Sequence, residues 1–223
     1  MLLKAVFWDL DGTLIDSEPV WHDGEIEIAH ANGGDWSEDL GWACSGTPVP
    51  DVARKMIERG CKLSVEAIDV QLKEYVFQYE VRHMPWIPGV LDVLRSLKDA
   101  GIPSMLVTTS PRRMAENLLS QADGLFAGYV CGDDPYAHKP DPAPYLAAAA
   151  KLGIAAEDMP RCVVLEDSEV GLKAGVASGA TVVAQQGWIR TDTTGLGQFA
   201  SISSYDGIDA KALDAFVARR LGE

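Results

Sequence analysis

The sequence has little positive charge. Its 19 lysines and arginines are outnumbered by 33 aspartates and glutamates, which gives a formal net charge of −14 at pH 7. Nucleic acids and anionic membranes are bound through basic surfaces, so we expect neither as a partner. A small anionic substrate is compatible with this charge if a metal ion or a local lysine reverses the field at its site.

The sequence also lacks paired cysteines and long hydrophobic runs. Its four cysteines, Cys44, Cys61, Cys131 and Cys162, lie far apart, and no pair has the spacing of a zinc site. Because a secreted chain would more often carry a disulfide framework, we expect a reduced, cytoplasmic setting. Asp9 stops the first apolar run after a few residues, so no signal peptide is expected. No segment approaches the roughly 20 apolar residues that span a bilayer.

Five short runs of β-forming residues predict the strands. Most of them are apolar without alternation, as in strands that are buried on both faces of a parallel sheet. They cover residues 3–8, 104–108, 128–131, 162–165 and 181–184. Helical patterns lie between them, over residues 88–101, 110–121, 142–153 and 168–179. This alternation predicts an α/β fold with a doubly wound, Rossmann-like parallel sheet.

Two of these helices carry specific local signals. Ser110 and Pro111 stand where an N-cap and a first helical residue are expected. Gly171, Gly175 and Gly179 recur four residues apart, which predicts a smooth helix face that packs closely against the sheet.

The pattern changes between the first two strands. Residues 16–85 contain no β-run but three helical patterns, around residues 20–30, 48–60 and 64–83. The third pattern places six apolar residues on one stripe, namely Val65, Ile68, Leu72, Tyr75, Val76 and Tyr79. The prolines of "MPWIPG", residues 84–89, suit a return linker. We therefore predict a core of residues 1–15 and 86–223, and a helical cap of residues 16–85 inserted after the first strand.

Two carboxylates follow the first predicted strand directly. Asp9 and Asp11 are separated by one residue and precede Gly12, which permits a sharp turn. In extended chain, residues two apart point the same way and lie about 6–7 Å from each other. Two acids so placed are costly unless a cation neutralises them, and hard oxygen ligands favour Mg²⁺.

The carboxyl ends of the other strands also carry polar side chains. These are Thr108, Thr109 and Ser110 after the second strand, Lys139 after the third, and Glu166 and Asp167 after the fourth. Taken singly, such residues are more often turns, helix caps or surface groups. Because parallel strands present their carboxyl ends to one ligand-binding edge, the four sets together predict a Mg²⁺ site facing a phosphate site.

The motifs "DLDGTL" (9–14), "VTTS" (107–110), "KPDP" (139–142) and "LEDS" (165–168) resemble the four motifs of the haloacid dehalogenase superfamily. The segment "DSEP" (16–19) and the helical insert resemble its subgroup of sugar-phosphate phosphatases and β-phosphoglucomutase-like proteins. Haloacid dehalogenases themselves lack the second aspartate of the first motif. Asp11 therefore indicates phosphoryl transfer rather than dehalogenation.

The resemblance implies roles for the acids. Asp9 would be the nucleophile that forms an aspartyl-phosphate, and Asp11 the general acid and base. Asp9 and Asp167 would bind Mg²⁺ through their side chains and Asp11 through its backbone carbonyl. Glu166 would either bind the ion directly or contact one of the ion's ligands.

The resemblance also implies groups that bind the substrate. The phosphoryl oxygens would be held by Thr108, Thr109 and Lys139. The cap would close over the site, and its candidate specificity residues are Glu18, Trp21, His22 and Thr47, the last beside a glycine turn at Gly46. The alternative is that Trp21 packs in the cap core and that His22 is a packing or surface residue.

Three functions are compatible with these motifs. In β-phosphoglucomutases a basic cap residue after the glycine turn grips a second phosphate, whereas "SGTPVPDVARK" (45–55) has no arginine before Arg54. This departure favours a phosphatase acting on a small phosphate ester over a mutase. A non-catalytic phosphate-binding module would be expected to have a broken motif, and none is broken. We further expect a monomer.

Overall fold

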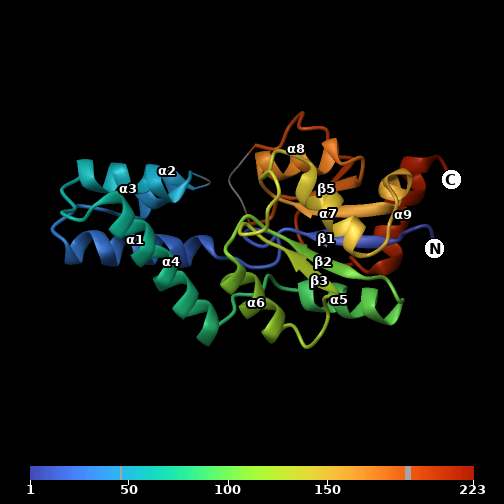
Figure 1. Cartoon of the computed structure of the whole chain (residues 1–223), viewed down its shortest axis with the longest axis horizontal. Coiled ribbons are helices and arrows are strands. Elements are labelled where there is room, and N and C mark those ends of the chain that lie inside the picture. Colours follow the sequence, from blue (N-terminus) through green and yellow to red (C-terminus); the bar gives the residue numbers. More distant parts are fainter. Residues whose placement is uncertain (46, 189–191) are drawn as a thin grey trace. The chain divides into compact units, whose positions relative to one another are not determined.

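The chain divides into two compact units in a computed structural model that describes residues 1–45, 47–188 and 192–223 (Figure 1). Met1–Asp16 and Trp86–Glu223 form the first unit, here called the core, and Ser17–Pro85 form the second, the cap. Gly46, where a turn was expected, lies outside the described residues. No helix in the described ranges has both the length and the apolar character needed to cross a membrane.

The core contains a six-stranded parallel sheet. Its strands are β1 (Ala5–Trp8), β2 (Ser104–Val107), β3 (Gly128–Val130), β4 (Cys162–Glu166), β5 (Thr181–Gln185) and β6 (Ala200–Ile202). They lie in the order β3-β2-β1-β4-β5-β6, and every neighbouring pair is parallel. The doubly wound α/β fold is therefore confirmed. The strand order reverses between β1 and β4, which is where open sheets of this kind bind their ligands.

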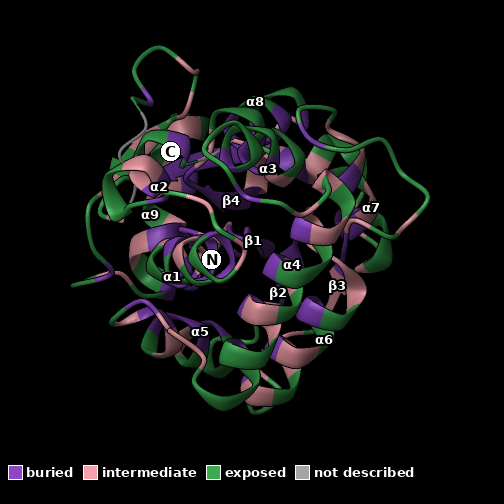
Figure 2. Ribbon diagram, turned by 90° about the vertical axis from the view of Figure 1, so that its left-hand side faces the viewer, coloured by how far each residue is buried: buried purple, intermediate pink, exposed green. Residues whose placement is uncertain are grey.

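The strands are buried by helices on both faces. All residues of β1, β2, β4 and β5 are buried, in agreement with their continuous apolar runs (Figure 2). Helices α7 (Ala143–Lys151) and α8 (Glu169–Ala177) cover one face, and α5 (Val90–Asp99) and α9 (Ala210–Leu221) cover the other. Helix α6 (Arg112–Gln121) follows β2, and a 3-10 helix (Ala156–Arg161) precedes β4.

Helix α8 packs against the sheet as its glycines predict at two of three positions. A Cβ atom at Gly175 would stand 3.0 Å from methyl groups of Val164 and Val182, so only glycine allows this approach to the sheet. Gly171 likewise lies against the carboxylate of Glu166, the last residue of β4. Gly179 lies just after the C-terminus of α8 and has a φ of 85°. It therefore terminates the helix and does not pack against the strands.

The cap consists of four helices: α1 (Glu18–Ala31), α2 (Glu38–Cys44), α3 (Val49–Glu58) and α4 (Val65–Arg82). Ile68, Leu72 and Val76 of the predicted stripe are fully buried in its core. Tyr79, at the end of the stripe, is 41% exposed, because the buried row of α4 continues in steps of four from Val76 to Glu80. The seven residues of α2 were not predicted, since so short a helix gives little periodicity.

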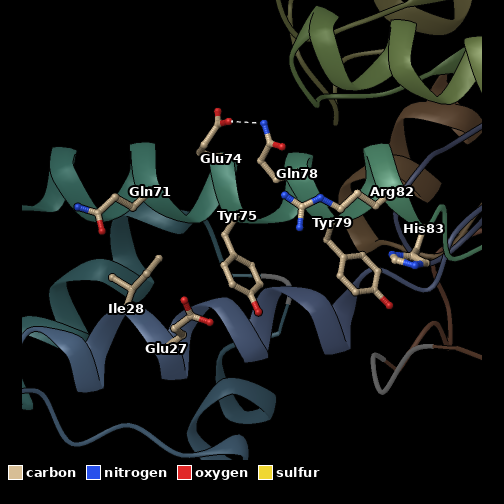
Figure 3. Close-up of a pocket in the computed structure, with 9 residues that line it drawn as sticks. All are labelled: Glu27, Ile28, Gln71, Glu74, Tyr75, Gln78, Tyr79, Arg82 and His83. Atoms are coloured by element: carbon tan, nitrogen blue, oxygen red, sulfur yellow. Dashed lines mark hydrogen bonds between the residues drawn. The ribbon is translucent and has the colours of Figure 1, made fainter.

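A cavity of about 580 Å³ lies on the cap between α1 and α4. Figure 3 shows Tyr75 and Tyr79 pointing from α4 toward α1, with Glu27 of α1 facing them. The ring of Tyr75 packs against Gly24, where a Cβ atom would stand 2.8 Å from its Cδ1. None of the polar residues singled out in the sequence lines this cavity, so it is separate from the candidate site described next.

Candidate active site

A buried lysine joins three strand ends in the core. The Lys139 ammonium donates to Asp9 Oδ1 over 2.6 Å, to Glu166 Oε1 over 2.5 Å and to the Val107 carbonyl over 2.9 Å. Asp9 follows β1, Val107 ends β2 and Glu166 ends β4. An ammonium group has three protons, and all three are used here. The lysine therefore fixes two acids and the neighbouring strand end at the switch point of the sheet.

Three acids gather around this lysine. Asp9, Glu166 and Asp167 each offer an oxygen atom, and these oxygens lie within 4.8 Å of one another. The hydroxyl of Thr13 donates to Asp167 Oδ1 over 3.2 Å. Carboxylate oxygens in such a cluster are the ligands that Mg²⁺ prefers, so the donor set fits the expected metal.

The three acids are not equivalent. Glu166 Oε1 accepts hydrogen bonds from Lys139 and from the Tyr145 hydroxyl, the latter over 2.8 Å. Glu166 Oε2 accepts from the backbone N–H groups of Asp167 and Ser168, both over 3.1 Å, and from the Ser168 hydroxyl over 3.0 Å. A carboxylate offers about four lone-pair sites, and five donors occupy these two oxygens. Glu166 is thus an anchor for its neighbours, while Asp9 and Asp167 keep oxygens for a cation.

Burial and mutual repulsion dominate the electrostatics of the cluster. Burial and the nearby charge of Glu166 raise the pKa of Asp9 to about 8, although the charge and the hydrogen bond of Lys139 lower it. Burial and the charge of Asp9 likewise raise the pKa of Asp167 well above its usual range. Burial alone would lower the pKa of Lys139, but the two acids that it contacts raise it, so the ammonium stays charged. The acids therefore carry uncompensated negative charge, which a bound cation would neutralise.

Asp11 lies in a tight loop after β1. Gly12 has a φ of 75° and donates its N–H to the Ile15 carbonyl over 2.8 Å, which closes the loop. The Asp11 carboxylate accepts a hydrogen bond of 3.1 Å from the Ser110 hydroxyl at the end of β2. Ser110 is not the N-cap that the sequence predicted: α6 begins at Arg112 with Pro111 as its N-cap, because the Ser110 side chain is turned toward Asp11.

The two threonines after β2 differ in their surroundings. Thr108 is buried, and its hydroxyl accepts a hydrogen bond of 2.9 Å from the Ser110 N–H. Thr109 is exposed, and its side chain makes no hydrogen bond to any residue in the described ranges. Thr108 directly follows Val107, whose carbonyl Lys139 binds, whereas Thr109 lies at the surface.

Two of the four specificity candidates meet in the cap. His22 Nε2 lies 3.2 Å from Glu18 Oε2, and both contact Ser45. Trp21 is half-buried and packs against the apolar core of the cap, as the alternative interpretation had it. Thr47 follows α2, and within the described residues its side chain contacts neither Glu18 nor His22 through a hydrogen bond.

Comparison with known proteins identifies the family. A model of the haloacid dehalogenase-like hydrolases matches residues 3–179, which is most of the chain. The chain belongs to the haloacid dehalogenase-like hydrolases. The resemblance seen in the motifs is thereby confirmed, and the curated relatives of this hydrolase mark it as a phosphatase.

Two relatives support this assignment, and a solved structure shares the fold. The chain is 31% identical to hexitol phosphatase B of Escherichia coli over 79% of its own length and 80% of the relative's. It is 29% identical to a phosphorylated carbohydrates phosphatase of Thermotoga maritima, over 79% and 82% of the two chains. A haloacid dehalogenase-family hydrolase from Entamoeba histolytica shares the fold with a TM-score of 0.81, at 21% identity and over 96% and 99% of the two chains.

The structure of this hydrolase adds residues that sequence reasoning missed. Tyr145 holds Glu166, Thr13 holds Asp167, and the Tyr205 hydroxyl donates to the Thr13 carbonyl over 2.7 Å. Thr13 lies inside the first motif and could have been weighed there. Tyr205 is separated from Thr13 by 192 positions, and no local sequence pattern predicts their contact.

Proposed function

We propose that the protein is a Mg²⁺-dependent phosphomonoesterase that hydrolyses a small phosphorylated metabolite, such as a sugar phosphate, through an aspartyl-phosphate. The observation that carries this proposal is the buried ammonium of Lys139 bridging Asp9 and Glu166. A lysine in this place can neutralise the oxygens of a phosphoryl group while the adjacent aspartate attacks its phosphorus. The names of the hexitol and carbohydrate phosphatases support the sugar-phosphate class.

The reaction would proceed in two displacements. A carboxylate oxygen of Asp9 forms a bond to phosphorus, the bond between phosphorus and the leaving oxygen breaks, and Asp11 gives that oxygen its proton. Asp11 then takes a proton from a water molecule that attacks the phosphorus, which releases inorganic phosphate and restores Asp9. Ser110 would orient Asp11 through its hydrogen bond of 3.1 Å.

The phosphoryl oxygens would be bound by Lys139 and the hydroxyl of Thr108, with Thr109 at the outer edge of the site. Mg²⁺, when bound, would neutralise charge on the acids and the phosphoryl group. It would be held by the side chains of Asp9 and Asp167 and the backbone carbonyl of Asp11. Glu166 would stabilise this arrangement through Lys139 and the start of α8 rather than by touching the ion.

A hydrolase is favoured over a phosphomutase. Arg54 is the first arginine after Gly46 in the sequence, and it is exposed on α3 and paired with Asp51 of the same helix. No arginine stands between Gly46 and Arg54 to bind a second phosphate, as a mutase of this family would need. We propose that the enzyme acts as a monomer. We also propose a reducing, cytoplasmic setting, which the four buried free cysteines support.

The test is hydrolysis of p-nitrophenyl phosphate with Mg²⁺ by wild type, by Asp9→Asn and by Asp99→Asn. Asp99 is an exposed acid at the end of α5 and serves as the matched control. We expect activity in the wild type and the control, and loss of activity together with loss of the acid-stable phosphate adduct in Asp9→Asn. Equal release of nitrophenol by all three proteins would rule out the nucleophile.

A second measurement separates phosphatase from mutase. The enzyme is given β-glucose 1-phosphate with a catalytic amount of glucose 1,6-bisphosphate. Free glucose and inorganic phosphate are expected. Accumulation of glucose 6-phosphate would establish the mutase instead.

A further inference from the structure

A cavity of about 260 Å³ lies in the core, at the end of the sheet that the candidate active site does not use. Residues of α8, β5, α9 and the segment before β6 line it, among them Val176, Ala180, Val182, Gln198, Phe199 and Arg220. Ala180 precedes β5 and Phe199 precedes β6, so the cavity lies where these strands begin. Asp9 and Glu166 stand where parallel strands end, at the opposite edge. Figure 1 shows both chain termini near the edge that holds the cavity.

Arg220 of α9 is the charged residue of this cavity. Its half-buried guanidinium donates one hydrogen bond, to the Thr181 hydroxyl over 3.2 Å. That hydroxyl gives its own proton to the Pro160 carbonyl over 2.8 Å, so it faces Arg220 as an acceptor. A guanidinium has five N–H donors, and four therefore have no protein acceptor among the described residues. Thr181 fixes the arginine in place without neutralising it.

The charge of Arg220 lacks a counter-charge. Burial lowers the pKa of Arg220, and no carboxylate of the described residues pairs with the guanidinium to oppose that effect. Ion pairs are instead made by well-exposed arginines, such as Arg54, Arg95 and Arg112, where water would solvate an unpaired charge at little cost. A partly buried charge is costly unless it is paired. Because acids outnumber lysines and arginines by 33 to 19, a shortage of acids does not explain the missing partner.

Most of the remaining wall is apolar. Ala180 and Val182 are buried, whereas Val176 and Phe199 are 39% and 40% exposed, so each has apolar surface that a ligand could cover. The volume lies just below the range of about 300–1,000 Å³ that holds drug-sized ligands, which suits a smaller molecule. A ligand that matches these walls has one negative group and a short hydrocarbon body.

We propose that this cavity binds a small organic monocarboxylate, with its carboxylate on Arg220 and its hydrocarbon part against Val176, Val182 and Phe199. The planar guanidinium presents parallel N–H groups that match the two oxygens of a carboxylate. Inorganic phosphate fits the site less well, because it is hydrated on all sides and the apolar walls would remove that water without replacing it. The site is independent of the proposed phosphatase function, since it lies at the other edge of the sheet.

The experiment titrates isobutyrate into the whole ¹⁵N-labelled protein and follows binding by NMR. The Nε–H signal of Arg220, identified by its absence in Arg220→Lys, should shift and saturate at millimolar concentrations. The amide of Gly197, which also lines the cavity, should shift with the same dissociation constant. Isobutyramide has nearly the same shape but no charge, and it should bind at least about tenfold more weakly.

The matched control is the neighbouring arginine on α9. Arg219 lies over the rings of Phe199 and Phe216, at 5.9 and 5.0 Å from their centroids, and is not among the residues that line the cavity. Arg219→Gln should therefore leave the dissociation constant unchanged, whereas Arg220→Gln should raise it about 10- to 100-fold. Arg220→Lys keeps the charge and the long stem but not the planar fork, so it should recover only part of that loss.

Thermal melting without ligand shows whether each variant is folded, and Arg220→Lys carries the comparison if Arg220→Gln does not fold. The proposal is overturned if the Arg220 signal does not move, if isobutyramide binds as tightly as isobutyrate, or if Arg219→Gln weakens binding as much as the Arg220 variants do. Inorganic phosphate is titrated in parallel, and tighter binding of phosphate at the same signals would refute the carboxylate assignment. None of these results depends on phosphatase activity, so a failure here leaves the proposed function standing.

Discussion

Replacing Gly171 by alanine tests the anchoring role of Glu166 without touching any polar group. Gly171 lies in the first turn of α8, and an added Cβ atom would stand 1.8 Å from Oε1, 1.9 Å from Cδ and 2.1 Å from Oε2 of Glu166. Ordinary van der Waals contact begins at 3.4 Å, so the carboxylate must retreat by 3.4 − 1.8 = 1.6 Å. A shift of that size disrupts its short hydrogen bonds to Lys139 and Tyr145.

The expected magnitude is the difference of two effects. Alanine in place of glycine inside a helix normally stabilises by about 1 kcal/mol. Breaking a buried ion pair costs about 3–5 kcal/mol, because it leaves an uncompensated charge. Gly171→Ala should therefore lower the free energy of unfolding by about 2–4 kcal/mol. Displacement of Lys139 by about 1 Å should also lower kcat about 100-fold.

Urea unfolding followed by tryptophan fluorescence measures the stability change, and Gly175→Ala is the matched control on the same helix. A Cβ atom there meets only valine methyls at 3.0 Å, so about 1–3 kcal/mol of stability should be lost with little change in kcat. In a Glu166→Ala background the clash is gone, and Gly171→Ala should now stabilise by up to about 1 kcal/mol. The same loss in both backgrounds would refute the reasoning.

Three further predictions follow from other contacts. Burial raises the pKa of Glu25, so the folded state loses stability as the pH rises from the pKa of the unfolded state through that of the folded state. Glu25→Gln keeps an acceptor for Trp36 and should raise the Tm at pH 7 more than at pH 4. An equal rise at both pH values would contradict this. Tyr205→Phe should cost about 1–2 kcal/mol in urea unfolding, whereas Tyr129→Phe, at a half-exposed hydroxyl, should cost less than about 0.5 kcal/mol. Chelation with EDTA should abolish phosphatase activity. Asp167→Asn should raise the Mg²⁺ concentration for half-maximal activity at least about tenfold. An unchanged Mg²⁺ titration would show that Asp167 is not a metal ligand.

Residues at strand ends could be predicted because two short-range facts suffice to place them. An apolar run identifies a buried strand, and a parallel sheet brings the carboxyl ends of its strands to one edge. Asp9, Lys139 and Asp167 meet there, although 158 positions separate the first from the last. The strand β6 escaped prediction because it has three residues at the sheet edge, none of them buried, and so lacks the apolar run.

Contacts that depend on the path of a loop could not be predicted in this way. The sequence predicts Ser110 as a helix N-cap, because serine before proline is commonly one. Its hydrogen bond to Asp11 could be predicted only if the position of Asp11 across the sheet were known. Tyr205 approaches the first motif because the positive φ and missing Cβ of Gly89 let the two backbones come close, with a Cβ there only 3.1 Å from that of Tyr205. Neither fact follows from a local pattern.

The number of donors around Glu166 also settles how charge is balanced at the site. When ionised, Asp9, Glu166 and Asp167 carry three negative charges, and Lys139 carries one positive charge, which leaves −2. Both carboxylate oxygens of Glu166 accept hydrogen bonds from protein donors, so the uncompensated charge resides on Asp9 and Asp167. One divalent cation matches that charge, whereas a monovalent ion would leave a carboxylate to take up a proton. The raised pKa values of Asp9 and Asp167 follow from this uncompensated charge together with burial, and a doubly charged ion would relieve both.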